Sequence, residues 1–194
     1  SICGGHNCGP GLLVQSFIAG RPMPLRRRSD GMPDVERAGA DLRVAATWLA
    51  EMNSATRRAD ADACDVARQR LLKVVREFRE LFALTPLEGG VVDDAVDALA
   101  GLLDRGVVVQ HGDFSSQNVL FKTPLESGPT IGVVDWTWSE EYGLPVHDLL
   151  FLVIGYFLQL RVEPGLQGFT GAFRQCLLDD GSTRDVVFDL LRRF

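Results

Sequence analysis

The chain has 194 residues, of which 46% are hydrophobic and 24% charged, so it can bury one substantial core, and no compositional break requires two domains. Its formal net charge of -6 argues against nucleic acid and against an anionic membrane surface as partners. No secretory signal is visible, and the apolar run 149–160 falls short of the about 20 residues that a membrane crossing needs, so we expect a cytoplasmic protein.

The N-terminal segment contains two of the four cysteines, Cys3 and Cys8, with His6 between them. A structural zinc site requires four ligands, and the sequence nearby offers no fourth one, so we predict no metal here. The segment 11–23 that follows is an apolar run, which predicts a strand that closes at the turn Gly20-Arg21-Pro22.

Most of the remaining chain has apolar residues at helical spacing, which predicts a mainly helical α+β protein. We expect these helices to build its core and the apolar run 149–160 to be a buried helix. The predicted helical patterns cover residues 42–52, 71–82, 92–103, 149–160, 169–177 and 186–194.

Between these helices, three β-branched or apolar runs predict short strands at 107–110, 119–121 and 131–134. Gly112 lets the backbone turn sharply after the first strand, so that Asp113 projects from a loop at a strand end. The breaker-rich segment 123–130 joins the second and third strands as a hairpin connection.

The pairing of this hairpin brings two oxygen-bearing side chains together. If Lys122 pairs with Ile131, Asn118 lies opposite Asp135, with Cα atoms about 4.5 to 5.5 Å apart. That separation suits two oxygen ligands of one hard cation such as Mg²⁺, which prefers a few protein oxygens plus phosphate oxygens and water. Asp113 is then left free to orient a hydroxyl and to accept its proton.

The run His111-Gly112-Asp113, the later Asn118, the pair Asp135-Trp136 and the segment 143–150 stand in an order that resembles the aminoglycoside phosphotransferase and choline kinase-like family. The resemblance covers about residues 12 to 160 and rests on several ordered motifs. It implies ATP-dependent phosphorylation of a small-molecule hydroxyl, with ATP as substrate and Mg²⁺ as cofactor.

Carried over by position, the resemblance implies a role for each residue of the motif. Asp113 is the catalytic base, and Asn118 and Asp135 are the magnesium ligands. His111 braces the loop, and Asp148 stabilises the catalytic segment from the start of the next helix. The Asp and Asn residues among them also have a structural alternative, because Asp and Asn near a turn are typical of turn or cap residues, and an Asp before an apolar run is an ordinary helix start.

The resemblance also implies a fold, the large C-terminal lobe of a protein-kinase-like domain with a small β-hairpin carrying the catalytic loop. Residues 1–23 are then a remnant of the last strand and hinge of the small lobe. Residues 24–194 are the helical lobe, with the catalytic loop at 111–118 and the metal strand at 131–135. In this family the hinge backbone pairs with adenine, so the candidate nucleotide neighbours are Gln15, Ser16, Phe17 and Ile18.

The N-terminal ATP lobe is expected to be largely absent from this chain. The glycines near the start do not give Gly-x-Gly-x-x-Gly, because Val14 occupies the last required position. The only lysines are Lys73, in a helical pattern, and Lys122, after the catalytic loop, so no strand Lys is available for the phosphates. The chain starts without Met and stops at Phe194 inside a helical pattern, which favours a piece of a longer parent protein that carries the missing lobe.

The sequence thus leaves two functions open. The first is a phosphotransferase that moves the γ-phosphate of ATP to a small-molecule hydroxyl, with this chain nearly inactive by itself. The alternative is a lobe-only pseudokinase that acts as a binding module. The missing small lobe favours the alternative, and the intact set of Asp113, Asn118 and Asp135 disfavours it.

Overall fold

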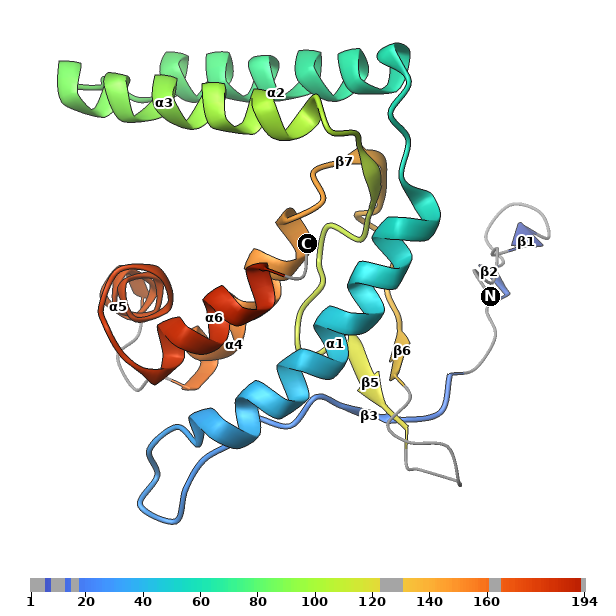
Figure 1. The fold of residues 1–194 in the computed structure, drawn as a ribbon, viewed down its shortest axis with the longest axis vertical. Coiled ribbons are helices and arrows are strands. Elements are labelled where there is room, and N and C mark those ends of the chain that lie inside the picture. Colours follow the sequence, from blue (N-terminus) through green and yellow to red (C-terminus); the bar gives the residue numbers. More distant parts are fainter. Residues whose placement is uncertain (1–5, 8–12, 15–17, 123–130, 161–164, 193–194) are drawn as a thin grey trace.

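The computed structural model describes residues 6–7, 13–14, 18–122, 131–160 and 165–192 (Figure 1). This part of the chain is mostly helical with small antiparallel sheets, as the sequence predicted. Among these residues, no helix combines the length and the apolar character that a membrane span requires. The described helices are α1 (Val35–Thr56), α2 (Ala61–Leu81), α3 (Pro86–Leu103), α4 (His147–Leu160), α5 (Gly165–Leu177) and α6 (Ser182–Leu191).

The described strands are short, and the predictions at 107–110, 119–121 and 131–134 are confirmed to within a residue at each end. The segment 111–118 connects two different sheets, because β4 does not join the sheet of β5 and β6. The sheets are β1 (His6–Asn7) with β2 (Leu13–Val14); β3 (Arg21–Pro22), β5 (Val119–Phe121) and β6 (Ile131–Val133) in that order; and β4 (Val108–Gln110) with β7 (Glu140–Gly143).

The predicted register of the β5–β6 hairpin is wrong by one residue. Phe121, not Lys122, pairs with Ile131, and Val119 pairs with Val133. Directly paired residues of an antiparallel sheet share a face, so this register puts Val119 on the same buried face as Ile131 and Val133. The predicted register would have set the buried Ile131 directly opposite the exposed Lys122, and burial decides against it.

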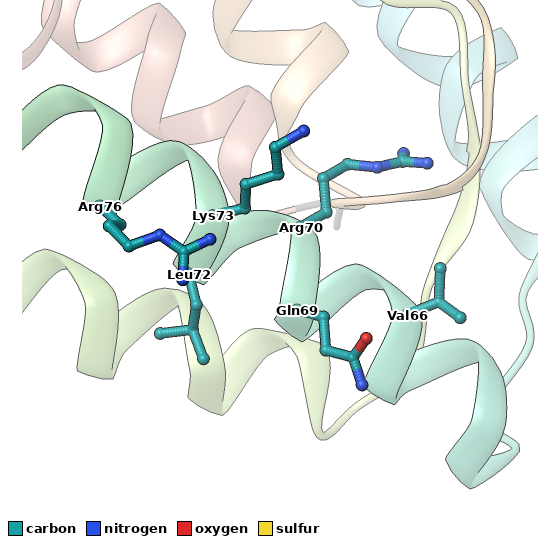
Figure 2. A pocket seen from close by; sticks show the side chains of 6 residues that line it. All are labelled: Val66, Gln69, Arg70, Leu72, Lys73 and Arg76. Carbon is teal, nitrogen blue, oxygen red and sulfur yellow. The ribbon is translucent and has the colours of Figure 1, made fainter.

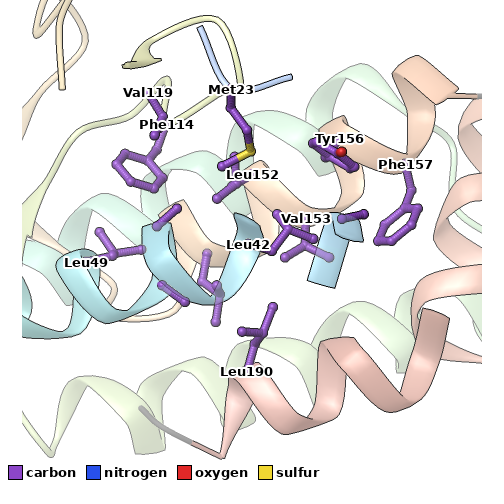
Figure 3. Packing of buried hydrophobic residues seen from close by; sticks show 14 of the residues in the cluster. Met23, Leu42, Leu49, Phe114, Val119, Leu152, Val153, Tyr156, Phe157 and Leu190 are labelled. Atoms are coloured by element: carbon purple, nitrogen blue, oxygen red, sulfur yellow. The ribbon is translucent and has the colours of Figure 1, made fainter. Parts of the chain in front are cut away.

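α1 is the central helix of the body, by which we mean the described residues outside the α2–α3 hairpin. It begins after Asp34, whose carboxylate accepts a hydrogen bond from the Arg37 backbone N–H at 3.2 Å. Its buried stripe packs against α4, α6 and the strands, as Figure 3 shows for Leu42 and Leu49 among the aromatic and aliphatic side chains around them. At about 25 cal/mol per Å² of buried apolar area, this shared core is the main stabilising contribution to the body.

α4 is confirmed as a buried helix and ties the N-terminal part of the chain to the core. The Tyr156 hydroxyl is fully buried with its ring; it donates to the Pro24 carbonyl at 2.9 Å and accepts from the Arg26 N–H at 2.8 Å. The Arg26 guanidinium in turn pairs with Asp41 of α1 at 2.6 Å. These bonds fix the entry of the chain into α1 at the surface of α4.

α2 and α3 form a long antiparallel hairpin that extends from the body (Figure 1). Their helical periodicity is confirmed, but the expectation that both build the core is wrong. Only Ala63, Cys64 and Ala67 of α2 and Leu103 of α3 are buried, in a small second cluster with Val107. The apolar residues further along both helices extend past the body and have no core to enter.

The hairpin is joined to the body where its two ends cross. Arg58 and Val107 exchange backbone hydrogen bonds of 2.8 Å in both directions. Gly106 precedes this crossing with a φ of +115°, and a Cβ there would lie 2.7 Å from the Arg58 carbonyl oxygen. A glycine is therefore required at this crossing.

Candidate active site

The segment 111–118 leaves β4 at His111, whose ring is completely buried. The ring Nε2 lies 2.9 Å from the Val134 carbonyl oxygen, and because a carbonyl can only accept, Nε2 carries the proton. Nδ1 then accepts a hydrogen bond from the Asp113 backbone N–H at 3.2 Å. His111 thus joins the end of β6 to the backbone of Asp113.

Asp148, in the first turn of α4, holds the same segment from the other side. Its buried carboxylate accepts hydrogen bonds from the backbone N–H groups of His111 at 2.6 Å and of Gly112 at 3.0 Å. His147 lies 3.4 Å from the same carboxylate. The negative charge also lies at the N-terminus of α4, where the helix dipole favours it. Asp148 is therefore both a residue of the helix start and a brace of the 111–118 segment.

Gly112 lies where the chain turns between these two braces. Its φ is +82°, in the left-handed region, and a Cβ at this position would lie 2.2 Å from the Trp138 carbonyl oxygen. Any other residue would have to push back the loop that follows Asp135. The turn predicted at Gly112 is confirmed, and its tightness comes from the 136–139 loop that packs directly on it.

Asp113 and Asn118 are in direct contact. The Asn118 Nδ2 donates to the Asp113 carboxylate Oδ2 and to the Asp113 backbone carbonyl, both at 2.9 Å. Two acceptors on one side fix the orientation of the amide, so Asn118 Oδ1 faces away from Asp113. Among the residues that the structure describes, no donor bonds to that oxygen, which leaves it available as a ligand atom.

Asp135 follows β6 and is exposed, with a φ of +60°. It is the only described non-glycine residue in the left-handed region, a conformation that costs a residue with a Cβ free energy and that clusters at functional sites. Asp135 Oδ1 accepts from the Thr137 hydroxyl at 2.6 Å. Asn118 lies opposite Val134 and not opposite Asp135 as predicted, since the register sets Val119 against Val133 and the Val134 N–H donates to the Asn118 carbonyl at 3.0 Å. Asp135 is the next residue after Val134, so Asn118 and Asp135 still lie at the same end of the hairpin.

Aromatic side chains pack behind this segment. The Trp136 ring lies 4.6 Å from that of His111, and Trp48 of α1 stacks on Phe114 with centroids 5.8 Å apart. Trp138, two residues beyond Trp136, is 70% exposed. Trp136 therefore belongs to the core side of the loop and Trp138 to its solvent side. The stacking of Trp48 on Phe114 and the hydrogen bond of the Thr137 hydroxyl were not predicted from the sequence. For Thr137, the pattern Asp-x-Thr is a local signal of a turn.

The candidate nucleotide neighbours are only partly described. Gln15, Ser16 and Phe17 lie outside the described residues. Ile18 is described and packs on β6, since a Cβ at Gly132 would meet its Cγ2 at 2.3 Å. The glycine at position 132 makes room for the Ile18 side chain, so this part of the predicted hinge lies against the strand that leads to Asp135.

The described residues contain no group of three or more His, Cys, Asp or Glu side chains placed to hold a metal ion, and Cys3 and Cys8 of the rejected zinc pattern lie outside them. A shallow hollow of about 580 Å³ lies on α2, away from the 111–118 segment (Figure 2). One helix alone lines it, and half of the six lining residues are long basic side chains, so it is a solvated helix surface and not an extension of the site.

A model of the phosphotransferase enzyme family matches residues 4–179 of the chain. The match includes the whole of the 111–118 segment, Asp135 and Asp148, and of the described helices only α6 lies outside it. It confirms the resemblance to the aminoglycoside phosphotransferase and choline kinase-like family. No curated protein matches the chain.

Proposed function

Because the chain belongs to the phosphotransferase enzyme family, we propose that it carries the catalytic and acceptor-binding residues of a kinase that transfers the γ-phosphate of ATP to a hydroxyl group of a small molecule. In this proposal, residues 24–194 form the large lobe of a protein-kinase-like domain, and Gln15 to Ile18 are the neighbours of the nucleotide. A small lobe on the parent protein supplies the remaining phosphate contacts.

The observation that carries the proposal is the bond from the Asn118 amide to Asp113. It holds the Asp113 carboxylate by Oδ2 and leaves Oδ1 to accept the proton of an acceptor hydroxyl. The braces from His111 and Asp148 to the backbone on both sides of Gly112 hold this carboxylate in place without touching its reactive oxygen. Positioning of this kind is the main contribution of the protein to phosphoryl transfer.

Mg²⁺ fits the donor set, since Asn118 Oδ1 and the exposed Asp135 carboxylate offer the hard oxygen ligands that this ion prefers. When bound, it neutralises negative charge on the phosphate oxygens. Thr137 holds Oδ1 of Asp135 and so leaves Oδ2 as the oxygen free to act as ligand. The left-handed φ of Asp135 costs conformational free energy that an ordinary turn residue would not cost. This strain supports a role for Asp135 beyond the turn.

The test is a coupled ADP-release assay with Mg²⁺, ATP and a panel of aminoglycosides, choline and sugars, run on the chain and on the parent protein. We expect little turnover by the chain, because its only lysines, Lys73 of α2 and Lys122 next to β5, cannot serve as the small-lobe Lys. In the parent, Asp113→Asn should lower kcat by about 10² to 10⁴, the usual contribution of a general base. Unchanged kcat would remove Asp113 from this role, and clear turnover by the chain alone would refute the need for the small lobe.

The alternative is a pseudokinase lobe that binds without catalysis. The observation that favours it is the position of the two lysines, neither of which lies on a strand that precedes α1. A glycine-rich strand turn and a strand Lys upstream of Ser1 would end the pseudokinase case. A chain that binds a ligand of the panel without turnover, and binds it equally well as Asp113→Asn, would support the binding module.

A further inference from the structure

A second packing cluster, separate from the main core, joins the base of the α2–α3 hairpin to β4 and β7. Tyr142 of β7 and Leu144, directly after that strand, are partly buried against this cluster. The hairpin base and the β4–β7 pair therefore pack together, and Figure 1 shows β7 beside that base. The buried members come from the two helices and from the residue before β4: Ala63, Cys64, Ala67, Leu103 and Val107.

The β4–β7 pair is the stem of the candidate site. β4 leads directly into the 111–118 segment, and β7 directly follows the loop 136–139 that begins after Asp135. The two strands are tied to each other, since Gln110 pairs with Glu140 and the Gln110 side chain accepts from the Leu144 N–H at 3.2 Å. A movement of β7 would therefore reach the far end of the loop 136–139.

The loop 136–139 and the 111–118 segment have different supports. The 111–118 segment is held to the body by the bonds of His111 and Asp148. The loop is held at its start, where Trp136 Nε1 donates to the Val133 carbonyl at 3.3 Å. Its next three residues are exposed, and its other end continues into β7. Because β7 contacts α2, the hairpin base supports this end of the loop.

Two arginines at the hairpin base reach β7 with their side chains. The Arg58 guanidinium donates to the Tyr142 hydroxyl at 3.1 Å and lies 5.1 Å from the centre of the Tyr142 ring. The Arg70 guanidinium of α2 forms an ion pair with the Glu140 carboxylate. Glu140 is the first residue of β7 and follows the loop directly, so the Arg70 pair is the hairpin contact that lies nearest to the loop in the sequence.

We propose that Arg70 is a positioning residue of the candidate site, which acts through Glu140 on the loop 136–139. The loop bears on the site at two points. The Trp138 carbonyl lies against Gly112, and the Thr137 hydroxyl donates to Asp135 Oδ1 at 2.6 Å.

A tilt of the α2–α3 hairpin would move Glu140 and with it the loop, so the hairpin controls the orientation of the Asp135 carboxylate. The braces of His111 and Asp148 do not involve the hairpin, so Asp113 keeps its place. The consequence for Asp135 rests on the proposed function, in which this carboxylate is a metal ligand. The coupling of hairpin and loop does not depend on that function.

Fluorine NMR of the chain labelled with fluorotryptophan tests the coupling, because each of the three tryptophans gives one resonance. Trp138 lies in the loop, whereas Trp48 lies in α1 and serves as the internal reference. Arg70→Ala should shift or broaden the Trp138 resonance and leave that of Trp48 unchanged. A Trp138 resonance that stays in place, or equal changes in both resonances, would overturn the proposal.

Native-state hydrogen exchange gives the size of the effect. The Ser139 N–H donates to the Trp136 carbonyl at 3.1 Å, within the loop. Its exchange should become about 2- to 5-fold faster in Arg70→Ala, which is the loss expected of one partly exposed ion pair. The N–H groups of His111 and Gly112, which Asp148 holds, should keep their rates. Faster exchange at all these positions would mean a general loosening and would contradict the proposal.

The matched control is Arg79→Ala. Arg79 lies on the same helix, forms an ion pair with Asp93 of α3, and its side chain is 41% exposed against 44% for Arg70. Its pair does not involve β7, so both the Trp138 resonance and the Ser139 exchange rate should stay unchanged. An effect equal to that of Arg70→Ala would show that any loss of charge on α2 disturbs the loop, and the role of Arg70 would be wrong.

A charge exchange tests whether Arg70 acts through Glu140. Arg70→Glu and Glu140→Arg should each change the Trp138 resonance, because each sets like charges opposite one another. The two substitutions together restore an ion pair and should return the resonance and the Ser139 exchange rate close to those of the unmodified chain. Effects that simply add would overturn the proposed route.

The parent protein tests the consequence for the site. Arg70→Ala should raise the half-saturating Mg²⁺ concentration about 2- to 5-fold, in proportion to the loss of the ion pair, and the charge exchange should reverse the change. An unchanged Mg²⁺ dependence would remove Arg70 as a positioning residue. A parent without turnover would instead contradict the proposed function, and the NMR and exchange measurements on the chain would still decide the coupling.

Discussion

The 111–118 segment and the α2–α3 hairpin are held in opposite ways. The segment depends on residues far away in sequence: Asp148 and Val134 bond to His111 from 37 and 23 positions away. The outer half of the hairpin depends on near neighbours, such as the capping box of Thr85 with Glu88 and the exposed ion pair of Arg79 with Asp93. The segment should therefore open only when the body unfolds, whereas the outer hairpin can open locally.

Asp148→Ala should produce the largest loss of stability, because it leaves two backbone N–H groups without the acceptor that the structure gives them. We expect the free energy of unfolding to fall by about 3 kcal/mol or more. Urea denaturation measures it, with Asp180→Ala as the control, since that carboxylate side chain is 95% exposed. A loss below about 1 kcal/mol would mean that Asp148 does not hold the segment.

The same substitution at two glycines should have opposite effects in the two regions. Gly112→Ala forces a residue with a Cβ to a φ of +82° and against the Trp138 carbonyl, and should cost about 2 to 3 kcal/mol. Gly90→Ala lies within α3, has nothing within 4 Å of the added Cβ, and should stabilise the chain by about 0.5 to 1 kcal/mol. Thermal unfolding of both variants gives the sign of each change in stability. Changes of the same sign would contradict the difference between the 111–118 segment and the hairpin.

Tyr156→Phe removes two buried hydrogen bonds from the body and should cost about 1 to 2 kcal/mol. Burial raises the pKa of the Tyr156 hydroxyl above its usual 10.0. The folded state therefore favours the protonated phenol, so this stabilisation is complete below pH 10 and is lost as the pH rises through the raised pKa. The free energy of unfolding, measured from pH 8 upward, should decline above pH 10. Tyr142→Phe is the control, and the decline should be less steep in Tyr156→Phe than in this control.

Thr85→Ala should have the smallest effect, confined to the hairpin. The Thr85 backbone N–H and the Thr85 hydroxyl both donate to the Glu88 carboxylate and hold the pKa of Glu88 below its usual 4.5. The Glu88 N–H donates back to the Thr85 hydroxyl, which completes the capping box. Loss of the cap should cost about 1 kcal/mol locally. Native-state hydrogen exchange should show faster exchange in the first turn of α3 and unchanged rates in α4. Faster exchange in α4 would show that the hairpin and the body open together.

Several parts of the fold were predictable because their signals are local. The helical spacing of α1 and α4 and the β-branched runs of β4, β5 and β6 each predicted the right element. The register of β5 with β6 was not predictable, because the local residue pattern does not distinguish two pairings one residue apart and the burial of Ile131 and Val133 decides between them. α2 was placed in the core because an apolar stripe gives the same sequence pattern whether or not the body covers it.

Of the candidate site, the sequence indicated the residue types and their order: Asp113, Asn118 and Asp135, with His111 and Asp148 beside them. Asp113 and Asn118 contact each other, and Asn118 shares its strand end with Asp135. No sequence signal indicates the orientation of the Asn118 amide or the left-handed backbone of Asp135. The contact of Gly112 with Trp138 has none either, since it depends on a loop brought in from another segment.

Sequence alone thus determined the family, the types of element and the residues with chemistry, because spacing within a few residues encodes them. Tertiary structure decided which oxygen of Asn118 is available, which register buries Ile131, and that half of the α2–α3 hairpin extends beyond the core. The physical reason is that local spacing sets which face of an element is apolar. The residues that bury this face come from segments far away in the sequence, and local spacing does not encode where those segments pack.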